Sequence, residues 1–69
     1  MNDEQCKSMF RGYLDQIRRS GQCAAYLPQK DFESMRDFIK CGNFTTTESA
    51  GESALNVHID GKVIIIRGY

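Results

Sequence analysis

The chain has 69 residues, of which 41% are apolar, and its nine basic and nine acidic side chains cancel to a formal net charge of zero. This length allows one small domain, residues 1–69, and the apolar fraction excludes a chain that is disordered throughout. A neutral chain also lacks the excess positive charge that drives sequence-independent binding to nucleic acids or to anionic membranes.

Residues 3–20 predict an amphipathic helix. Apolar side chains recur there at helical spacing and form one continuous stripe, consisting of Cys6, Met9, Phe10, Tyr13, Leu14 and Ile17. Asn2 or Asp3 can cap the start of this helix, and Gly21 stands where a left-handed terminating residue is expected. We therefore expect the helix to bury one stripe and to expose the rest of its surface.

The next segment, residues 22–27, is ambiguous, because it is compatible with a short strand, a helical turn or a packed connection. Pro28 is a favourable first residue for a second helix over 28–41. The side chains expected to face inward from this helix are Phe32, Met35, Phe38, Ile39 and Cys41. Gly42 and Asn43 then end it.

After the second helix, the apolar spacing changes to a period of two. Residues 44–48 have strand propensity but little apolar content, which favours an edge strand. Residues 49–52 predict a turn. Two further strands, over 54–59 and 62–67, flank Asp60-Gly61, a dipeptide that accepts the positive φ angles of a tight hairpin turn. The expected fold is α+β (ααβββ), with two amphipathic helices packed on a three-stranded antiparallel sheet.

The last strand is apolar on both faces, because Val63, Ile64, Ile65 and Ile66 follow one another without a break. A two-residue hairpin loop would place Ile64 and Ile66 on the face of Leu55, Val57 and Ile59, and a three-residue loop would place Val63 and Ile65 there. In both registers, two aliphatic side chains lie beside Asn56 and His58. Either residues 22–27 cover this second face, or it is an exposed patch that serves a partner.

The cysteines, Cys6, Cys23 and Cys41, are odd in number, and no basic and then apolar leader stands at the start of the sequence. We therefore expect reduced thiols and a cytoplasmic location. The longest apolar run, residues 63–66, is too short to cross a bilayer. The cysteines and His58 have the composition of a zinc site, but such sites usually use ligand pairs about two to four residues apart, and no such pair is present. We expect no metal and no cofactor.

One pair of residues has the composition for nucleophilic catalysis. Cys23 lies in the glycine-flanked connection, where we expect it to be the accessible cysteine, and His58 is the single histidine. A domain of this size leaves little room for a pocket that excludes water. The sequence therefore does not favour an enzyme.

The favoured function is a small non-enzymatic protein-binding module of the inhibitor, regulatory or accessory type. It would bind another protein, or a second copy of itself as a homodimer, through an apolar patch on the C-terminal hairpin. The anchors are Val63 and Ile65, or Ile64 and Ile66 in the other register. The surrounding polar and aromatic residues are Asn56, His58, Arg67 and Tyr69. The unpaired edge of strand 44–48 is an alternative surface.

The alternative function is a small winged-helix-like regulator that binds nucleic acid. Its basic candidates are Arg36 and Lys40 on the second helix and Lys62 and Arg67 on the hairpin. Acidic residues interrupt the second helix, and the sequence predicts two helices where a helix-turn-helix core needs three. Nucleic-acid binding therefore ranks second.

Overall fold

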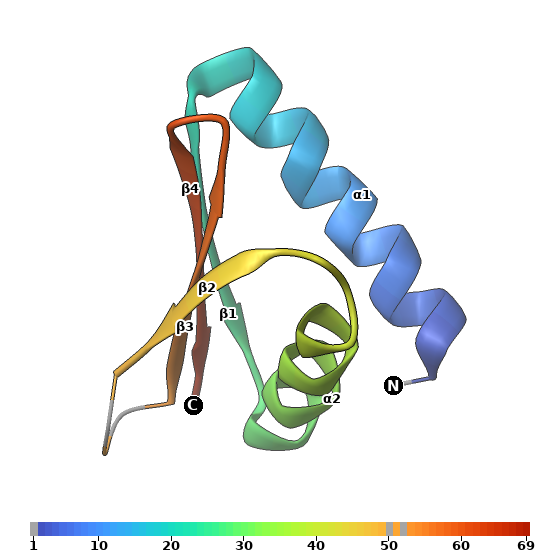
Figure 1. Ribbon diagram of the computed structural model, residues 1–69. Helices are drawn as coiled ribbons and strands as arrows, with labels where there is room; N and C mark the ends of the chain where they lie inside the picture. The colour runs from blue at the N-terminus through green and yellow to red at the C-terminus, as the bar shows by residue number, and fades with distance from the viewer. Residues whose placement is uncertain (1, 50, 52) are drawn as a thin grey trace.

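The computed structural model describes residues 2–49, 51 and 53–69. Within this part of the chain, the elements follow one another as α1 (Asp3–Ser20), β1 (Gln22–Leu27), α2 (Gln29–Lys40), β2 (Thr45–Glu48), β3 (Ala54–Ile59) and β4 (Lys62–Gly68). The strands form one sheet in the order β1-β4-β3-β2. Both helices lie on the same side of this sheet, so the molecule has two layers (Figure 1).

The α+β class and the two helices are confirmed, but the predicted sheet is wrong in its size and in its strand directions. Residues 22–27 form β1, which pairs in parallel with β4, while the pairs β2–β3 and β3–β4 are antiparallel. The sheet is therefore mixed and has four strands. The second helix is α2, over Gln29–Lys40, instead of residues 28–41. The predicted turn at 49–52 includes residues 50 and 52, which lie outside the described residues.

The helix α1 begins and ends at the predicted signals. The Asn2 side chain accepts a hydrogen bond from the Gln5 N–H at 2.8 Å, and the Gln5 side chain accepts one from the Asn2 N–H at 3.1 Å, which together make a capping box. At the other end, Gly21 has a φ of 83° and donates its N–H to the Ile17 carbonyl at 2.8 Å. A side chain would strain that backbone, so the direct exit from α1 into β1 depends on Gly21.

The β3–β4 hairpin has the two-residue loop. Asp60 has a φ of 50° and Gly61 a φ of 76°, the positive values that a type I′ turn requires at both central positions. The strand pairing places Val57 opposite Ile64. Since directly opposed residues share a face of the sheet, this register decides which aliphatic side chains of β4 turn toward the helices.

The core lies between the helices and one face of the sheet. The helices contribute Cys6, Phe10, Ile17, Phe32, Met35 and Ile39 to it, and the strands contribute Cys23, Leu27, Leu55, Val57, Ile64 and Ile66. Ile64 and Ile66 are fully buried, whereas Val63 and Ile65, which alternate with them along β4, lie on the opposite face and are only half-buried. The run of aliphatic residues in β4 is thus divided between the core and the other face of the sheet.

This division predicts different costs for truncating neighbouring isoleucines. Ile64→Ala should lower the free energy of unfolding by about 2–5 kcal/mol, because it leaves a cavity in the core. Ile65→Ala should cost about 1 kcal/mol or less, because that side chain lies outside the core. Urea denaturation of the two variants measures the difference. Equal losses would contradict the assignment of faces.

Replacement of two of the glycines by alanine should have opposite effects on the stability of the fold. A Cβ on Gly12, in the middle of α1, would meet nothing within 4 Å, so Gly12→Ala should stabilise the fold by about 1 kcal/mol. A Cβ on Gly68 would lie 2.7 Å from Gln29 Oε1 and 3.0 Å from Phe32 Cβ, so Gly68→Ala should destabilise it. Thermal unfolding followed by circular dichroism measures both shifts, and a fall in Tm for Gly12→Ala would contradict the description of α1.

Candidate functional site

The sheet face that turns away from both helices is the candidate site. Alternation along each strand and the pairing between strands determine its members. They are Gln22, Ala24 and Tyr26 of β1, Val63, Ile65 and Arg67 of β4, Ala54, Asn56 and His58 of β3, and Thr45 and Thr47 of β2. We call this set the open face.

The centre of the open face is aliphatic. Ile65 lies there between Ala24 of β1 and Asn56 of β3, and Val63 is on the same strand two residues away. Tyr26 extends the apolar surface on the β1 side, and 67% of it is exposed. Neither Val63 nor Ile65 packs against the core cluster, so both are available to a molecule that covers this face.

Polar groups surround this centre. His58 Nε2 lies 3.1 Å from Thr47 Oγ1 of the neighbouring strand, and this hydrogen bond holds the imidazole on the β2 side of the face. Arg67 is exposed beside Tyr26. The open face, as it is defined by the described residues, carries no carboxylate, so its one formally charged side chain is a cation.

Five of the six predicted contact residues lie together on this face, namely Asn56, His58, Val63, Ile65 and Arg67. The sixth, Tyr69, follows β4 and is 76% exposed. Its N–H donates to the Leu27 carbonyl at 2.9 Å, and its carbonyl accepts from the Gln29 N–H at 3.0 Å. Tyr69 thus adjoins the end of β1, and a partner at these residues stays a prediction.

The sequence-based alternative, in which residues 22–27 cover the second face, is wrong. That segment lies in the plane of the sheet as β1, and its Ala24 and Tyr26 belong to the open face. The available signal was the alternation of Cys23, Ala25 and Leu27 with these residues. It is weak, because two of the five side chains are alanine.

The expected accessibility of the cysteines is reversed. Cys23 is buried beneath the helices and its thiol donates to Gln16 Oε1 at 3.4 Å, whereas Cys41, expected to face inward, is exposed at the C-terminal cap of α2. His58 lies on the other face of the sheet from Cys23. Burial raises the pKa of the Cys23 thiol and that of Cys6, and a protonated thiol is a poor nucleophile. Cys23 and His58 therefore do not form a catalytic pair.

The described residues offer no ready metal site. Among them, no group of three or more His, Cys, Asp or Glu side chains lies where it could hold a metal ion. The thiols of Cys6, Cys23 and Cys41 are free. Neither described helix is long and apolar enough to cross a membrane.

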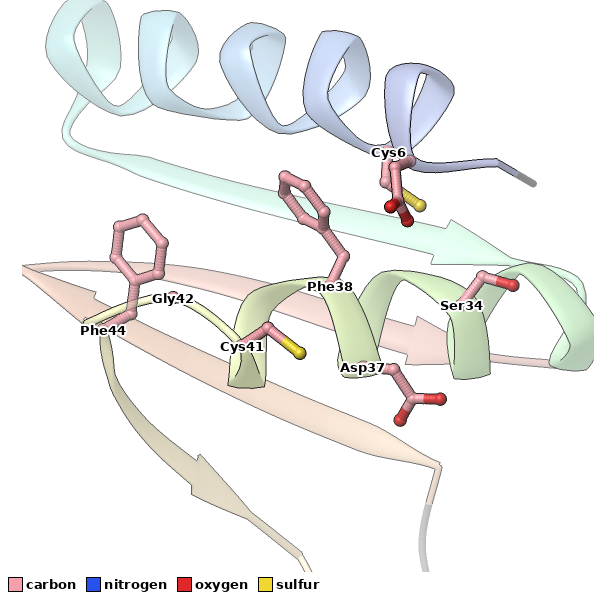
Figure 2. Close-up of a pocket in the computed structure, with 8 residues that line it drawn as sticks. Cys6, Ser34, Asp37, Phe38, Cys41, Gly42 and Phe44 are labelled. Atoms are coloured by element: carbon pink, nitrogen blue, oxygen red, sulfur yellow. The ribbon is translucent and has the colours of Figure 1, made fainter.

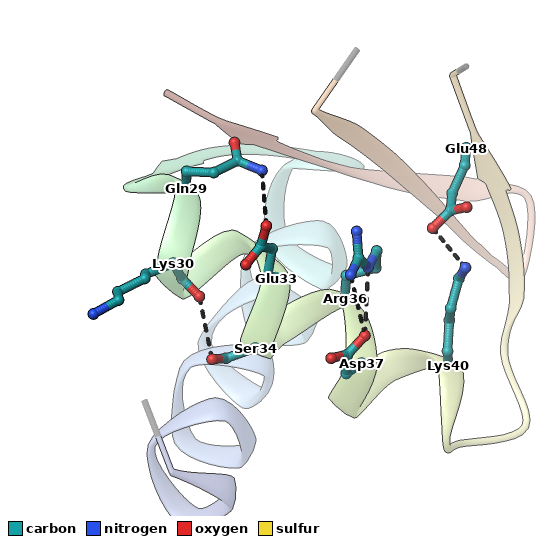
Figure 3. Close-up of polar contacts among 8 residues, drawn as sticks. All are labelled: Gln29, Lys30, Glu33, Ser34, Arg36, Asp37, Lys40 and Glu48. Atoms are coloured by element: carbon teal, nitrogen blue, oxygen red, sulfur yellow. Dashed lines mark hydrogen bonds and ion pairs between the residues drawn. The ribbon is translucent and has the colours of Figure 1, made fainter. Parts of the chain in front are cut away.

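The four basic candidates do not form one surface. Arg36 Nε lies 3.4 Å from Asp37 Oδ1, and Lys40 Nζ lies 2.7 Å from Glu48 Oε1, so both candidate cations on α2 already face carboxylates (Figure 3). Lys62 and Arg67 lie on opposite faces of β4, because Lys62 shares the face of Ile64.

A hollow with a volume of about 530 Å³ lies between the N-terminal turns of α1 and the C-terminal half of α2 (Figure 2). It is lined by Asp3, Cys6, Ser34, Asp37, Phe38, Cys41, Gly42 and Phe44. The ring of Phe44 packs edge-on against Phe10, with a centroid separation of 5.0 Å. No histidine is among the lining residues, so neither Ser34 nor Cys41 has an imidazole base there.

Comparison of the chain with protein-family models, with curated proteins and with solved structures finds no match. Function is therefore inferred from the geometry and chemistry of the open face.

The buried thiols predict a loss of stability in alkali. The unfolded chain releases thiol protons near the ordinary cysteine pKa of about 8.5, whereas burial raises the pKa of Cys6 and Cys23 in the folded chain. The contribution of these thiols to stability is therefore complete below about pH 8.5 and is lost as the pH rises above it. Urea denaturation from about pH 7 to about pH 9.5 measures the fall.

The double variant Cys6→Ala/Cys23→Ala should show a shallower fall than the wild type. An identical pH dependence in the double variant would contradict this explanation.

Proposed function

We propose that this chain is a small non-enzymatic protein-binding module that docks another protein against its open face, as an inhibitor, regulatory or accessory factor inside the cell. The observation that carries the proposal is the division of β4. Ile64 and Ile66 complete the core, while Val63 and Ile65 occupy the centre of a sheet face that neither helix covers.

The open face has the composition of a small interface. Protein interfaces combine an apolar centre with a polar rim, and aromatic residues and arginine are enriched among their strongest contacts. Here Val63 and Ile65 supply the centre, and Tyr26, His58 and Arg67 lie around it. Complete burial of an exposed aliphatic side chain contributes about 1.5–3 kcal/mol, so covering this centre favours association.

The charge of the open face indicates the chemistry of the partner. The described part of the face carries the Arg67 guanidinium and no carboxylate. A partner with an apolar surface bordered by a carboxylate would match it, because Arg can donate two parallel hydrogen bonds to a carboxylate. We propose a partner protein of that kind.

Binding to a protein is better supported than binding to nucleic acid. Arg36 and Lys40 lie within ion-pair distance of carboxylates, and Lys62 faces away from Arg67. The separation of Cys23 from His58 by the sheet supports a non-enzymatic role. The free thiols support a reducing, intracellular location.

Exchange of Ile65 for lysine tests the proposal. Affinity capture from cells of the native host identifies the proteins bound by the wild-type chain, and calorimetry with the purified partner then measures Kd. Ile65→Lys should raise Kd at least about tenfold, which corresponds to about 1.4 kcal/mol, because a charge would be buried at the centre of the interface.

Ser8→Lys is the matched control, since Ser8 is exposed on α1 and lies away from the open face. It should leave Kd unchanged. Circular dichroism should show that both variants fold. A partner that binds Ile65→Lys as tightly as the wild type would refute the proposal.

A further inference from the structure

The strand β1 presents outward main-chain groups at one edge of the sheet, and among them the Gln22 carbonyl accepts a hydrogen bond from Ser20 Oγ at 3.1 Å. Leu27 is opposite Gly68, and its carbonyl accepts a hydrogen bond from the Tyr69 N–H at 2.9 Å, so the main-chain groups of Leu27 point toward β4. Successive residues of a strand point these groups to alternate sides. The N–H and C=O of Gln22, Ala24 and Tyr26 therefore point away from the sheet. We call these groups the β1 edge.

The two edges of the sheet differ in protection. Folded proteins usually protect an edge strand with charged residues, proline, a bulge or a short length. The opposite edge, β2, has four residues, and its Glu48 forms an ion pair with Lys40. By contrast, β1 has six residues in unbroken register with β4, and none of them is charged or proline. The β1 edge is thus suited to pairing with another strand.

We propose that β1 pairs with β1 of a second copy of this chain, antiparallel, about a two-fold axis that passes through Ala24. In this arrangement Ala24 lies opposite Ala24 of the second copy, and Gln22 lies opposite Tyr26. These are the residues whose main-chain groups point outward, so each opposed pair exchanges two hydrogen bonds. The two sheets become one continuous sheet with all helices on one side.

The alternation of side chains along β1 favours this register. Opposed residues in an antiparallel pair share a face, and Gln22, Ala24 and Tyr26 all belong to the open face. A two-fold axis at Ala25 would place Gln22 opposite Pro28, which has no N–H to donate. The axis at Ala24 satisfies the outward groups of all three residues, and this self-complementarity favours a second copy over a foreign strand.

The flank of α1 beside β1 is also compatible with a second copy. Gln16 accepts the hydrogen bond of the Cys23 thiol at 3.4 Å, so its side of α1 overlies β1. Residues at helical spacing from Gln16 lie on the same flank, namely Gln5, Met9, Gly12, Tyr13, Arg19 and Ser20. Arg19 is the charged member of this set. On the other flank, Arg18 lies near Ile59 and Lys62 at the hairpin.

The proposed axis would bring the same flank of the two α1 helices toward each other. Gly12 has no side chain to obstruct the approach. The contact leaves Val63 and Ile65 uncovered, so this inference does not depend on the proposed function.

Analytical ultracentrifugation over a range of concentrations tests the dimer. The wild-type chain should pass from the monomer mass to the dimer mass. Ala24→Pro should stay monomeric at every concentration, because proline removes the outward N–H of residue 24 and no internal hydrogen bond. Ile65→Lys is the matched control and should dimerise like the wild type, which separates this test from that of the proposed function.

Disulfide trapping tests the register in a Cys41→Ser background. Opposed Cα atoms at such positions are about 5.5 Å apart, within the range that a disulfide spans. Ala24→Cys should therefore cross-link to itself under oxidation. Gln22→Cys and Tyr26→Cys should cross-link when mixed, and neither should do so alone.

A wild-type chain that stays monomeric up to about millimolar concentration would overturn the proposal. So would a dimer that Ile65→Lys abolishes and Ala24→Pro preserves, because that result would place the contact on the open face. If circular dichroism shows that Ala24→Pro does not fold, the cross-linking of Ala24→Cys to itself becomes the test of the dimer. Its absence refutes the β1 edge contact.

Discussion

The strand β4 is paired on both sides, with β1 in parallel and with β3 through a turn of only two residues. This turn imposes a register, and in a sheet the register decides the face of every side chain along the strand. Four consecutive branched aliphatic residues then divide between two environments. Ile64 and Ile66 enter the core with the helices, and Val63 and Ile65 enter the open face. The aliphatic part of the core from β4 and the aliphatic centre of the open face both follow from that division.

The number of covering elements explains why one face stays open. The helices α1 and α2 both pack on the face that holds Ile64 and Ile66, and the described residues provide no third element for the other face (Figure 1). A larger domain often covers both faces of a sheet that contains parallel strands. In a chain of 69 residues, the second face retains apolar side chains at its centre. The proposed docking of a partner depends on these uncovered side chains.

The open face and the β1 edge differ in chemistry. The open face offers side chains, with aliphatic anchors at its centre and Arg67 and His58 around them. The β1 edge offers main-chain donors and acceptors and small or neutral side chains. A partner bound at Val63 and Ile65 and a second copy paired at Ala24 would therefore use different physical interactions. The two proposals can be refuted separately.

The sequence by itself determined the elements whose stabilising contacts are local. The helix cap at Asn2, the Gly21 terminus and the Asp60-Gly61 turn each involve residues within a few positions of one another, so local patterns predicted them, with Asp3 as the other candidate for the cap. The turn was compatible with two registers of the hairpin. In one of them, Val63 and Ile65 lie beside Asn56 and His58. The sequence alone therefore predicted that Asn56 and His58 would lie beside the aliphatic centre of the open face.

Only the tertiary structure decided the parallel pairing of β1 with β4, since these strands are far apart in the chain and α2, β2 and β3 lie between them. The same pairing buries Cys23, exposes Tyr26 and creates the β1 edge. Residues 22–27 have little intrinsic preference, because alanine is common in several kinds of structure. Their conformation therefore depends on β4, whose second edge they pair with and beside which Cys23 and Leu27 enter the core.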